Sequence, residues 1–126
     1  MIVVDTSVWV DYLIGGDPLL DELLDRESVL VHPFVVGEVA MGNLRNRAAV
    51  LNMLGDLPGI EVSTDEAILT FVAQENLGGT GLSYIDAHLL AATCRFGGAV
   101  LWTRDKRLHT VAQRFQIAMD VEGRLQ

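Results

Sequence analysis

The sequence has a single cysteine, Cys94, and so cannot form a disulfide within the chain. Small secreted domains usually depend on several disulfides, so this scarcity favours a reducing compartment. The sequence also lacks a signal-like basic leader, and no apolar run approaches the roughly 20 residues of a membrane-spanning helix. We therefore expect a cytoplasmic protein without a membrane segment. The residues around Cys94 are typical of a helix interior, which favours a small buried side chain over a reactive thiol.

Basic residues are few: nine lysines and arginines stand against 17 acidic residues, for a net charge of −8. This balance at first argues against a nucleic-acid partner. However, four carboxylates gathered around bound cations would account for half of that charge, and an acidic surface also suits a basic protein partner. The basic residues fall in two clusters that we consider candidates for holding substrate phosphates, although each is also explained as a solvated surface charge. The clusters are Arg45 with Arg47, and Arg104, Lys106 and Arg107 around Asp105.

Short apolar runs alternate with segments of helical periodicity along the 126 residues, without repeats or linkers. This length predicts a single domain, residues 1–126. Strands are predicted at 2–4, 29–31, 60–62, 99–102 and 117–121. Helices are predicted at 7–14, 18–27, 33–44, 47–57, 63–76 (with Ser63 and Glu66 as a capping box), 83–96 and 105–115. The alternation predicts an α/β fold whose central, mainly parallel sheet of four to five strands is covered by helices on both faces.

Acidic residues stand where predicted strands give way to helices. Asp5 follows the first strand and Asp105 follows the strand at 99–102. Ligands of such sheets collect outside the carboxyl ends of the strands, so these two carboxylates are expected to share a site. Helix capping explains each one equally well. For Asp86 the capping explanation is stronger still, because Ser83 to Asp86 matches a capping pattern before an apolar run.

Glu38 distinguishes between these alternatives. Its neighbours at helical spacing are apolar or small, so its carboxylate is expected to point toward the core or a cleft beside it. An ionised carboxylate without a partner is costly to bury. Either Arg45, about two helical turns further along on roughly the same side, pairs with it, or Glu38 serves a function.

Four carboxylates in one pocket suit a hard divalent cation, Mg²⁺ or Mn²⁺. Zinc is not favoured, because His32, His88 and His109 lack the spacing of a zinc motif. Thr103 is placed to support a carboxylate in the same cleft, or to form a turn of its own. Thr6 and Ser7 are interpreted as helix-start residues that hydrogen-bond to Asp5, since no base lies near them in sequence.

Four segments in this order resemble the PIN-domain ribonucleases, and more narrowly the VapC toxins of bacterial toxin–antitoxin pairs. The resemblance covers essentially the whole chain. Two positions depart from it. Some relatives carry an acidic residue where this chain has Lys106, so the resemblance supports a second metal ion less strongly than the first. Family members often carry an aromatic residue where this chain has Leu108. The matching segments are Val-Asp-Thr-Ser-Val-Trp from residue 4, Val-Gly-Glu-Val from 36, Ser-Tyr-Ile-Asp-Ala-His-Leu-Leu-Ala-Ala from 83, and Leu-Trp-Thr-Arg-Asp-Lys-Arg-Leu from 101.

The resemblance implies a three-layer α/β/α sandwich and an endoribonuclease that cleaves RNA with metal-activated water. It implies that Asp5, Glu38, Asp86 and Asp105 hold one or two Mg²⁺ or Mn²⁺ ions, with Thr103 in support. It also implies a homodimer and a cognate antitoxin that sends a basic side chain into the acidic pocket.

Other functions remain open from the sequence. A catalytically silent nuclease-like module would bind RNA or a protein without cleaving. A metal-dependent phosphatase of the haloacid-dehalogenase type would need a second aspartate two residues after Asp5, where this chain has Ser7. A phosphoacceptor receiver domain would need an acidic pair after the first strand, and it would leave Glu38 without a role.

Overall fold

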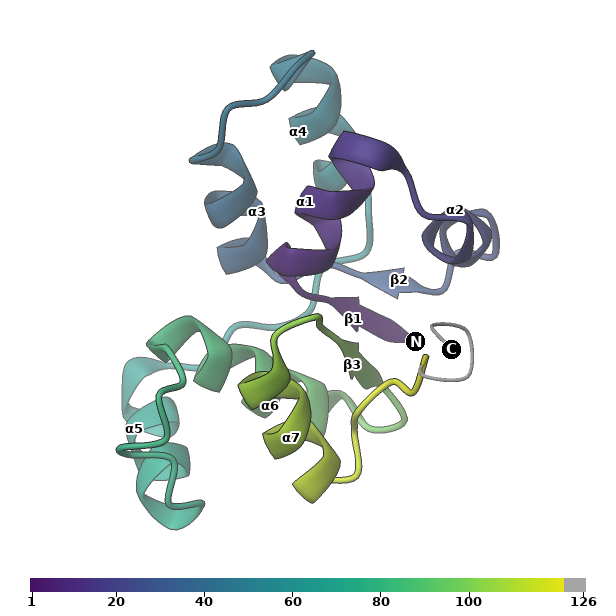
Figure 1. The fold of residues 1–126 in the computed structure, drawn as a ribbon. Coiled ribbons are helices and arrows are strands. Elements are labelled where there is room, and N and C mark those ends of the chain that lie inside the picture. The colour runs from purple at the N-terminus through teal and green to yellow at the C-terminus, as the bar shows by residue number, and fades with distance from the viewer. Residues whose placement is uncertain (122–126) are drawn as a thin grey trace.

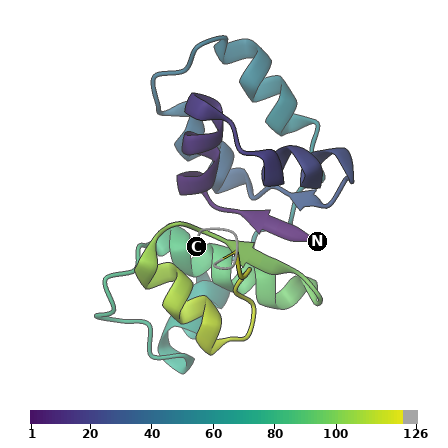
Figure 2. The same ribbon diagram turned by 45° about the vertical axis from the view of Figure 1, so that its right-hand side comes forward.

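The computed structural model describes residues 1–121 and shows a small parallel sheet between two groups of helices (Figures 1 and 2). The strands are β1 (Ile2–Val4), β2 (Val29–Leu30) and β3 (Val100–Trp102). The helices are α1 (Thr6–Gly15), α2 (Pro18–Asp25), α3 (Pro33–Ala40), α4 (Arg47–Gly55), α5 (Asp65–Gln74), α6 (Tyr84–Phe96) and α7 (Lys106–Arg114). None of the described helices is long and apolar enough to cross a bilayer.

The sheet has the order β2-β1-β3, and both pairings are parallel. Figure 1 shows α1, α3 and α4 on one side of the strands and α5, α6 and α7 on the other. Val3 and Val4 are adjacent in β1, so their side chains face opposite sides of the sheet, and both are fully buried. Both faces of β1 are therefore covered, which confirms the predicted α/β fold with a parallel sheet.

The strand count differs from the expectation of four to five. Only three strands form within residues 1–121. The segment predicted at 117–121 reduces to a single parallel bridge, and the segment predicted at 60–62 forms no strand but directly follows another single bridge. One bridge joins Val31 to Gly59, and the other joins Leu101 to Ala118. Beside these bridges a few backbone bonds reach the sheet, from the Ile60 amide to the Val31 carbonyl and from the Met119 amide to the Leu101 carbonyl, without extending into a strand.

Most helix boundaries agree with the sequence pattern, and two differ. The helix that carries Glu38 ends at Ala40 instead of continuing to residue 44. The cap of α5 is Thr64, whose hydroxyl accepts from the amide of Ala67. Ser63, the predicted cap, instead accepts a hydrogen bond from Arg95. A serine and a threonine are adjacent here and both are good caps, so the pattern alone could not choose between them.

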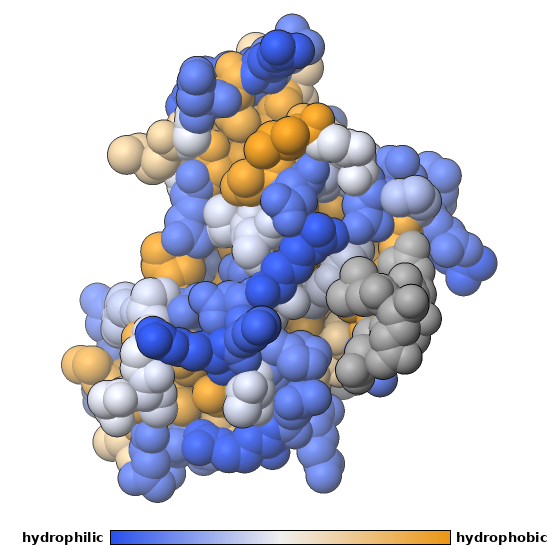
Figure 3. Space-filling view, in the orientation of Figure 1, coloured by the Kyte–Doolittle hydropathy of each residue, from blue (hydrophilic) through white to orange (hydrophobic). Residues whose placement is uncertain are grey.

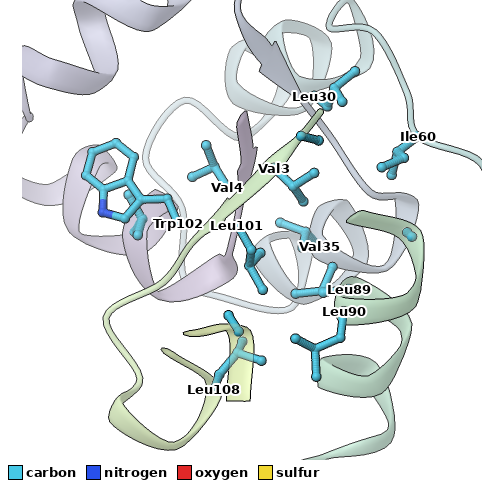
Figure 4. Packing of buried hydrophobic residues seen from close by; sticks show 14 of the residues in the cluster. Val3, Val4, Leu30, Val35, Ile60, Leu89, Leu90, Leu101, Trp102 and Leu108 are labelled. Atoms are coloured by element: carbon cyan, nitrogen blue, oxygen red, sulfur yellow. The ribbon is translucent and has the colours of Figure 1, made fainter. Parts of the chain in front are cut away.

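The core joins the two groups of helices through the sheet (Figure 4). Val3 from β1, Val35 from α3 and Leu89 from α6 are all fully buried members of one apolar cluster. Because α3 carries Glu38 and α6 carries Asp86, this packing fixes two of the candidate site residues relative to β1. The core thus positions the elements on which the carboxylates stand.

Candidate metal centre

Asp5 is buried directly after β1, where it caps α1. Its backbone amide donates to the carbonyl of Trp102 at the end of β3, so the two strand ends lie side by side. Its Oδ2 atom accepts hydrogen bonds from the hydroxyls of Ser7 and Thr103, both at 2.7 Å. Burial with two hydroxyl donors holds this carboxylate in one orientation.

Asp105 follows β3 after a two-residue turn and caps α7. Its Oδ1 atom accepts from the amides of Arg107 and Leu108 at 2.9 and 3.1 Å. Its own amide donates to the hydroxyl of Thr103 at 3.1 Å. Thr103 therefore joins Asp5 to Asp105, which is the supporting position that the sequence suggested for it.

Asp86 lies in the first turn of α6 and forms a capping box with Ser83. Burial raises the pKa of the Asp86 carboxyl, its hydrogen bonds with Ser83 act in the opposite direction, and the negative charges of Asp5 and Asp105 raise it further. Asp5 and Asp105 are thus the acidic residues whose charges act on Asp86. Asp86 can therefore cap α6 and also belong to the same acidic site as Asp5 and Asp105.

Glu38 stands on α3 and is exposed, with its Oε1 atom accepting from the Thr6 hydroxyl at 2.6 Å. Thr6 directly follows Asp5, so this bond ties α3 to the start of α1. Glu38 also lines a groove of about 440 Å³ that Arg45 borders. The expected cleft is present but the expected burial is not, and no ion pair joins Glu38 to Arg45 within the described residues. The alternative explanation of Glu38 as half of an ion pair therefore has no contact to support it.

One pattern is common to the four carboxylates. Each uses a single oxygen for structural hydrogen bonds: Oδ2 of Asp5, Oε1 of Glu38, Oδ2 of Asp86 and Oδ1 of Asp105. Within residues 1–121 no hydrogen bond or ion pair reaches the other oxygen of any of them.

These four open oxygens are hard donors, the chemistry that Mg²⁺ and Mn²⁺ select. The donor set therefore fits such an ion, although no three acidic, histidine or cysteine side chains of the described chain converge on one point. Like charges repel at short range, and each carboxylate here turns to its own donor, which accounts for the spread.

Two of the five candidate phosphate-binding residues are engaged in the fold. The guanidinium of Arg104 bridges Asp11 on α1 and Asp17 at the start of α2, with ion pairs of 2.8 and 2.7 Å. Arg47 donates to the carbonyl of Ala40 at the end of α3. Both side chains brace elements around the site.

The other three candidates are exposed: Arg45, Lys106 and Arg107. Arg107 is held most closely, because a Cβ atom added to Gly81 would lie 2.5 Å from its Nη1. The guanidinium therefore packs on the Gly81 backbone, which has a φ of +86°. Gly81 lies two residues before the cap of α6, so this guanidinium lies beside the segment that leads to Asp86.

Two of the histidines, His32 and His88, are buried in the core and not at the surface. His32 caps α3 through its Nδ1 atom, and its ring lies 6.0 Å from that of His88. Burial, with a contribution from His88, lowers the pKa of His32 to about 4, and burial also lowers the pKa of His88. Both imidazoles are therefore neutral at neutral pH. Cys94 also differs from expectation, since it lies on α6 as predicted but is exposed.

Ser7 is the site residue whose role the sequence did not reveal. It was expected to contact Asp5, and it does. Its hydroxyl also accepts from the amide of Arg104, which is 97 residues away in sequence. No local pattern signals such a contact.

Comparisons with known proteins identify the family of this chain. Residues 2–114 match the model of the PIN domain. Ribonuclease VapC32 of two Mycobacterium tuberculosis strains, CDC 1551 / Oshkosh and ATCC 25618 / H37Rv, is 41% identical over 122 residues, which covers 97% of this chain and 98% of the relative. In fold, the chain is similar to the crystal structure of PAE2754 from Pyrobaculum aerophilum, with a TM-score of 0.65, 20% identity, and coverage of 98% of this chain and 91% of that one. The chain belongs to the PIN-domain family and is a VapC-like member of it.

Proposed function

We propose that the protein is a metal-dependent endoribonuclease, the toxin of a toxin–antitoxin pair that acts in the cytoplasm. The observation that carries this proposal is the set of four carboxylates around the ends of β1 and β3, each with one oxygen outside the hydrogen-bond network. The near full-length similarity to a ribonuclease supports RNA as the substrate.

Asp5, Glu38, Asp86 and Asp105 are the proposed ligands of Mg²⁺ or Mn²⁺. When bound, such an ion lowers the pKa of a water molecule and stabilises negative charge on phosphoryl oxygens. Thr103 orients Asp5 and the amide of Asp105, while α3 and α6 bring Glu38 and Asp86 to the same edge of the sheet. Burial, with a smaller contribution from the charges of Asp5 and Asp105, raises the pKa of Asp86, and a bound cation would offset the contribution of those two charges.

Among the basic residues, Arg107 is the strongest candidate for a contact with an RNA phosphate, with Lys106 and Arg45 as further exposed candidates. The Gly81 backbone holds the Arg107 guanidinium near the start of α6. A guanidinium in this position offers paired N–H donors for phosphate oxygens. Arg104 and Arg47 contribute by bracing the site.

Replacing Arg107 with alanine is expected to weaken binding of a labelled single-stranded RNA pool and to reduce the slope of log K against log salt by roughly 0.7, the value of one phosphate contact on single strands. Fluorescence anisotropy in EDTA measures both without cleavage. Arg114→Ala is the matched control, because Arg114 stands at the other end of α7 and donates to the carbonyl of Glu75. An Arg107→Ala variant with the parent's affinity and slope would remove this residue from the substrate site.

An antitoxin is the proposed protein partner, with a basic side chain that reaches the acidic site. The groove beside Glu38 supports this, because its wall includes the exposed apolar residues Val10 and Ile14 of α1. Figure 3 shows hydrophobic surface over the part of the molecule that contains α1 and α4. The net charge of −8 complements a basic partner. We also propose a homodimer, as the family resemblance implies.

The full-length protein incubated with mixed RNA tests the activity. We expect cleavage with Mg²⁺ or Mn²⁺, loss of cleavage on addition of EDTA, and its return when the cation is restored in excess. RNA binding without cleavage in any cation would instead identify a silent binding module. Release of phosphate from small phosphate esters with intact RNA would identify a phosphatase.

A further inference from the structure

Two hydroxyls clamp the Asp5 carboxylate in the same way. Ser7 Oγ and Thr103 Oγ1 each donate to Oδ2 of Asp5 at 2.7 Å. Each also accepts a backbone amide from the turn between β3 and α7: Ser7 accepts from Arg104 at 3.0 Å and Thr103 accepts from Asp105 at 3.1 Å. The two hydroxyls thus connect one carboxylate to two successive peptide groups.

The direction of each of these hydrogen bonds follows from the number of protons on the two hydroxyls. A hydroxyl has one proton, and both protons are used on Oδ2 of Asp5. The two hydroxyl oxygens approach each other at 3.4 Å with no proton left between them, so neither can turn to the other without releasing Asp5. The clamp therefore holds one oxygen of the carboxylate and leaves Oδ1 outside the hydrogen-bond network of residues 1–121.

The turn itself is anchored from a second direction. The guanidinium of Arg104 pairs with Asp11 on α1 and with Asp17 at the start of α2. The Arg104 amide is consequently held close to α1, where Ser7 accepts it. Ser7 is the point at which Asp5, α1 and the turn bearing Asp105 meet.

We propose that Ser7 is a positioning residue of the cation site, which fixes the orientation of Asp5 relative to Asp105 so that both carboxylates can bind one divalent cation. This inference rests on the proposed function, because it assumes that these acids bind a cation. It assigns Ser7 a role beyond starting α1. Groups that hydrogen-bond to a metal ligand typically change metal affinity by about 10- to 100-fold when they are removed.

Binding of Mn²⁺ to the full-length protein, measured by electron paramagnetic resonance without RNA, tests the proposal directly. Ser7→Ala is expected to weaken Mn²⁺ binding by about 10- to 100-fold. Ser7→Thr, which keeps the hydroxyl, is expected to retain affinity within about threefold of the parent, clearly below the 10- to 100-fold loss of the alanine variant. Ser28→Ala is the matched control, because the Ser28 hydroxyl donates to the Arg26 carbonyl, outside the site. It is expected to bind as the parent does.

The outcomes separate this inference from the proposed function. Parental Mn²⁺ affinity in folded Ser7→Ala would overturn the positioning role and leave the proposed function intact. A parent that binds no Mn²⁺ would overturn both. A purely structural role would lower the unfolding temperature of Ser7→Ala without changing the affinity of its folded fraction, and that result also counts against the proposal. If Ser7→Ala does not fold, Ser7→Cys replaces it, since a thiol fills the same space but is a weak donor, and the same loss of affinity is expected.

Discussion

Asp5→Asn is expected to reduce RNA cleavage by more than about 100-fold. Loss of a group that only hydrogen-bonds to a metal ligand typically costs about 10- to 100-fold, and loss of the charged ligand itself should cost more. The substitution removes the negative charge at the centre of the site. It also places an amide where Ser7 and Thr103 donate to a carboxylate oxygen. Asparagine caps helices about as well as aspartate does, so α1 should keep its start. Initial cleavage rates with saturating Mg²⁺, together with thermal unfolding, measure the two effects separately.

Asp17→Asn is the matched control for this experiment. Asp17 caps α2 with its carboxylate, as Asp5 caps α1, and the substitution removes the same charge. Its ion pair with Arg104 is partly exposed and should be worth no more than about 1 kcal/mol, and Arg104 keeps its second ion pair, with Asp11, so the turn stays anchored. We expect this variant to cleave RNA within a few fold of the parent. Equal losses in the two variants, or an unfolded Asp5→Asn protein, would favour capping as the role of Asp5.

The sequence was sufficient to predict the fold class and to nominate Asp5 and Asp105, because both depend on short-range rules. A buried apolar strand followed by a helix cap identifies the end of a strand, and parallel strands place their carboxyl ends together. The structure shows those two ends joined by the bond from the Asp5 amide to the Trp102 carbonyl. Capping and ligand roles could not be separated from sequence, because one carboxylate has two oxygens and can serve both.

Contacts between distant segments account for what the sequence could not supply. The stripe of apolar neighbours around Glu38 indicated a cleft, but its exposure depends on how α3 packs beside α1 through Thr6. The role of Ser7 depends on an amide 97 residues away. The segments predicted as strands at 60–62 and 117–121 have strand-like composition, yet neither forms a strand, and the bridges at the two sheet edges involve only Gly59 and Ala118 within the described chain. In all three cases the deciding interaction is tertiary.

Leu89→Ala should have the largest effect on stability, a loss of about 2–5 kcal/mol. Leu89 is fully buried on α6, one turn after Asp86, in the cluster that also contains Val3 and Val35 (Figure 4). Truncation removes apolar contacts and leaves a cavity between elements that cannot fully close around it. Domains of this kind are stable by only about 5–15 kcal/mol, so the loss should be visible as a large shift in the urea midpoint.

Leu69→Ala makes the same chemical change on α5, where the side chain is 62% exposed, and should alter stability by no more than about 0.5 kcal/mol. The pair also separates stability from chemistry. Since Leu89 supports the helix that carries Asp86 but is not itself a proposed ligand, cleavage by Leu89→Ala should fall in proportion to its unfolded fraction. Cleavage should recover at lower temperature if folding recovers. A Leu89→Ala protein that stays folded but loses cation binding would instead mean that α6 shifts locally, and that the core sets the spacing of the carboxylates more tightly than hydrogen bonds alone.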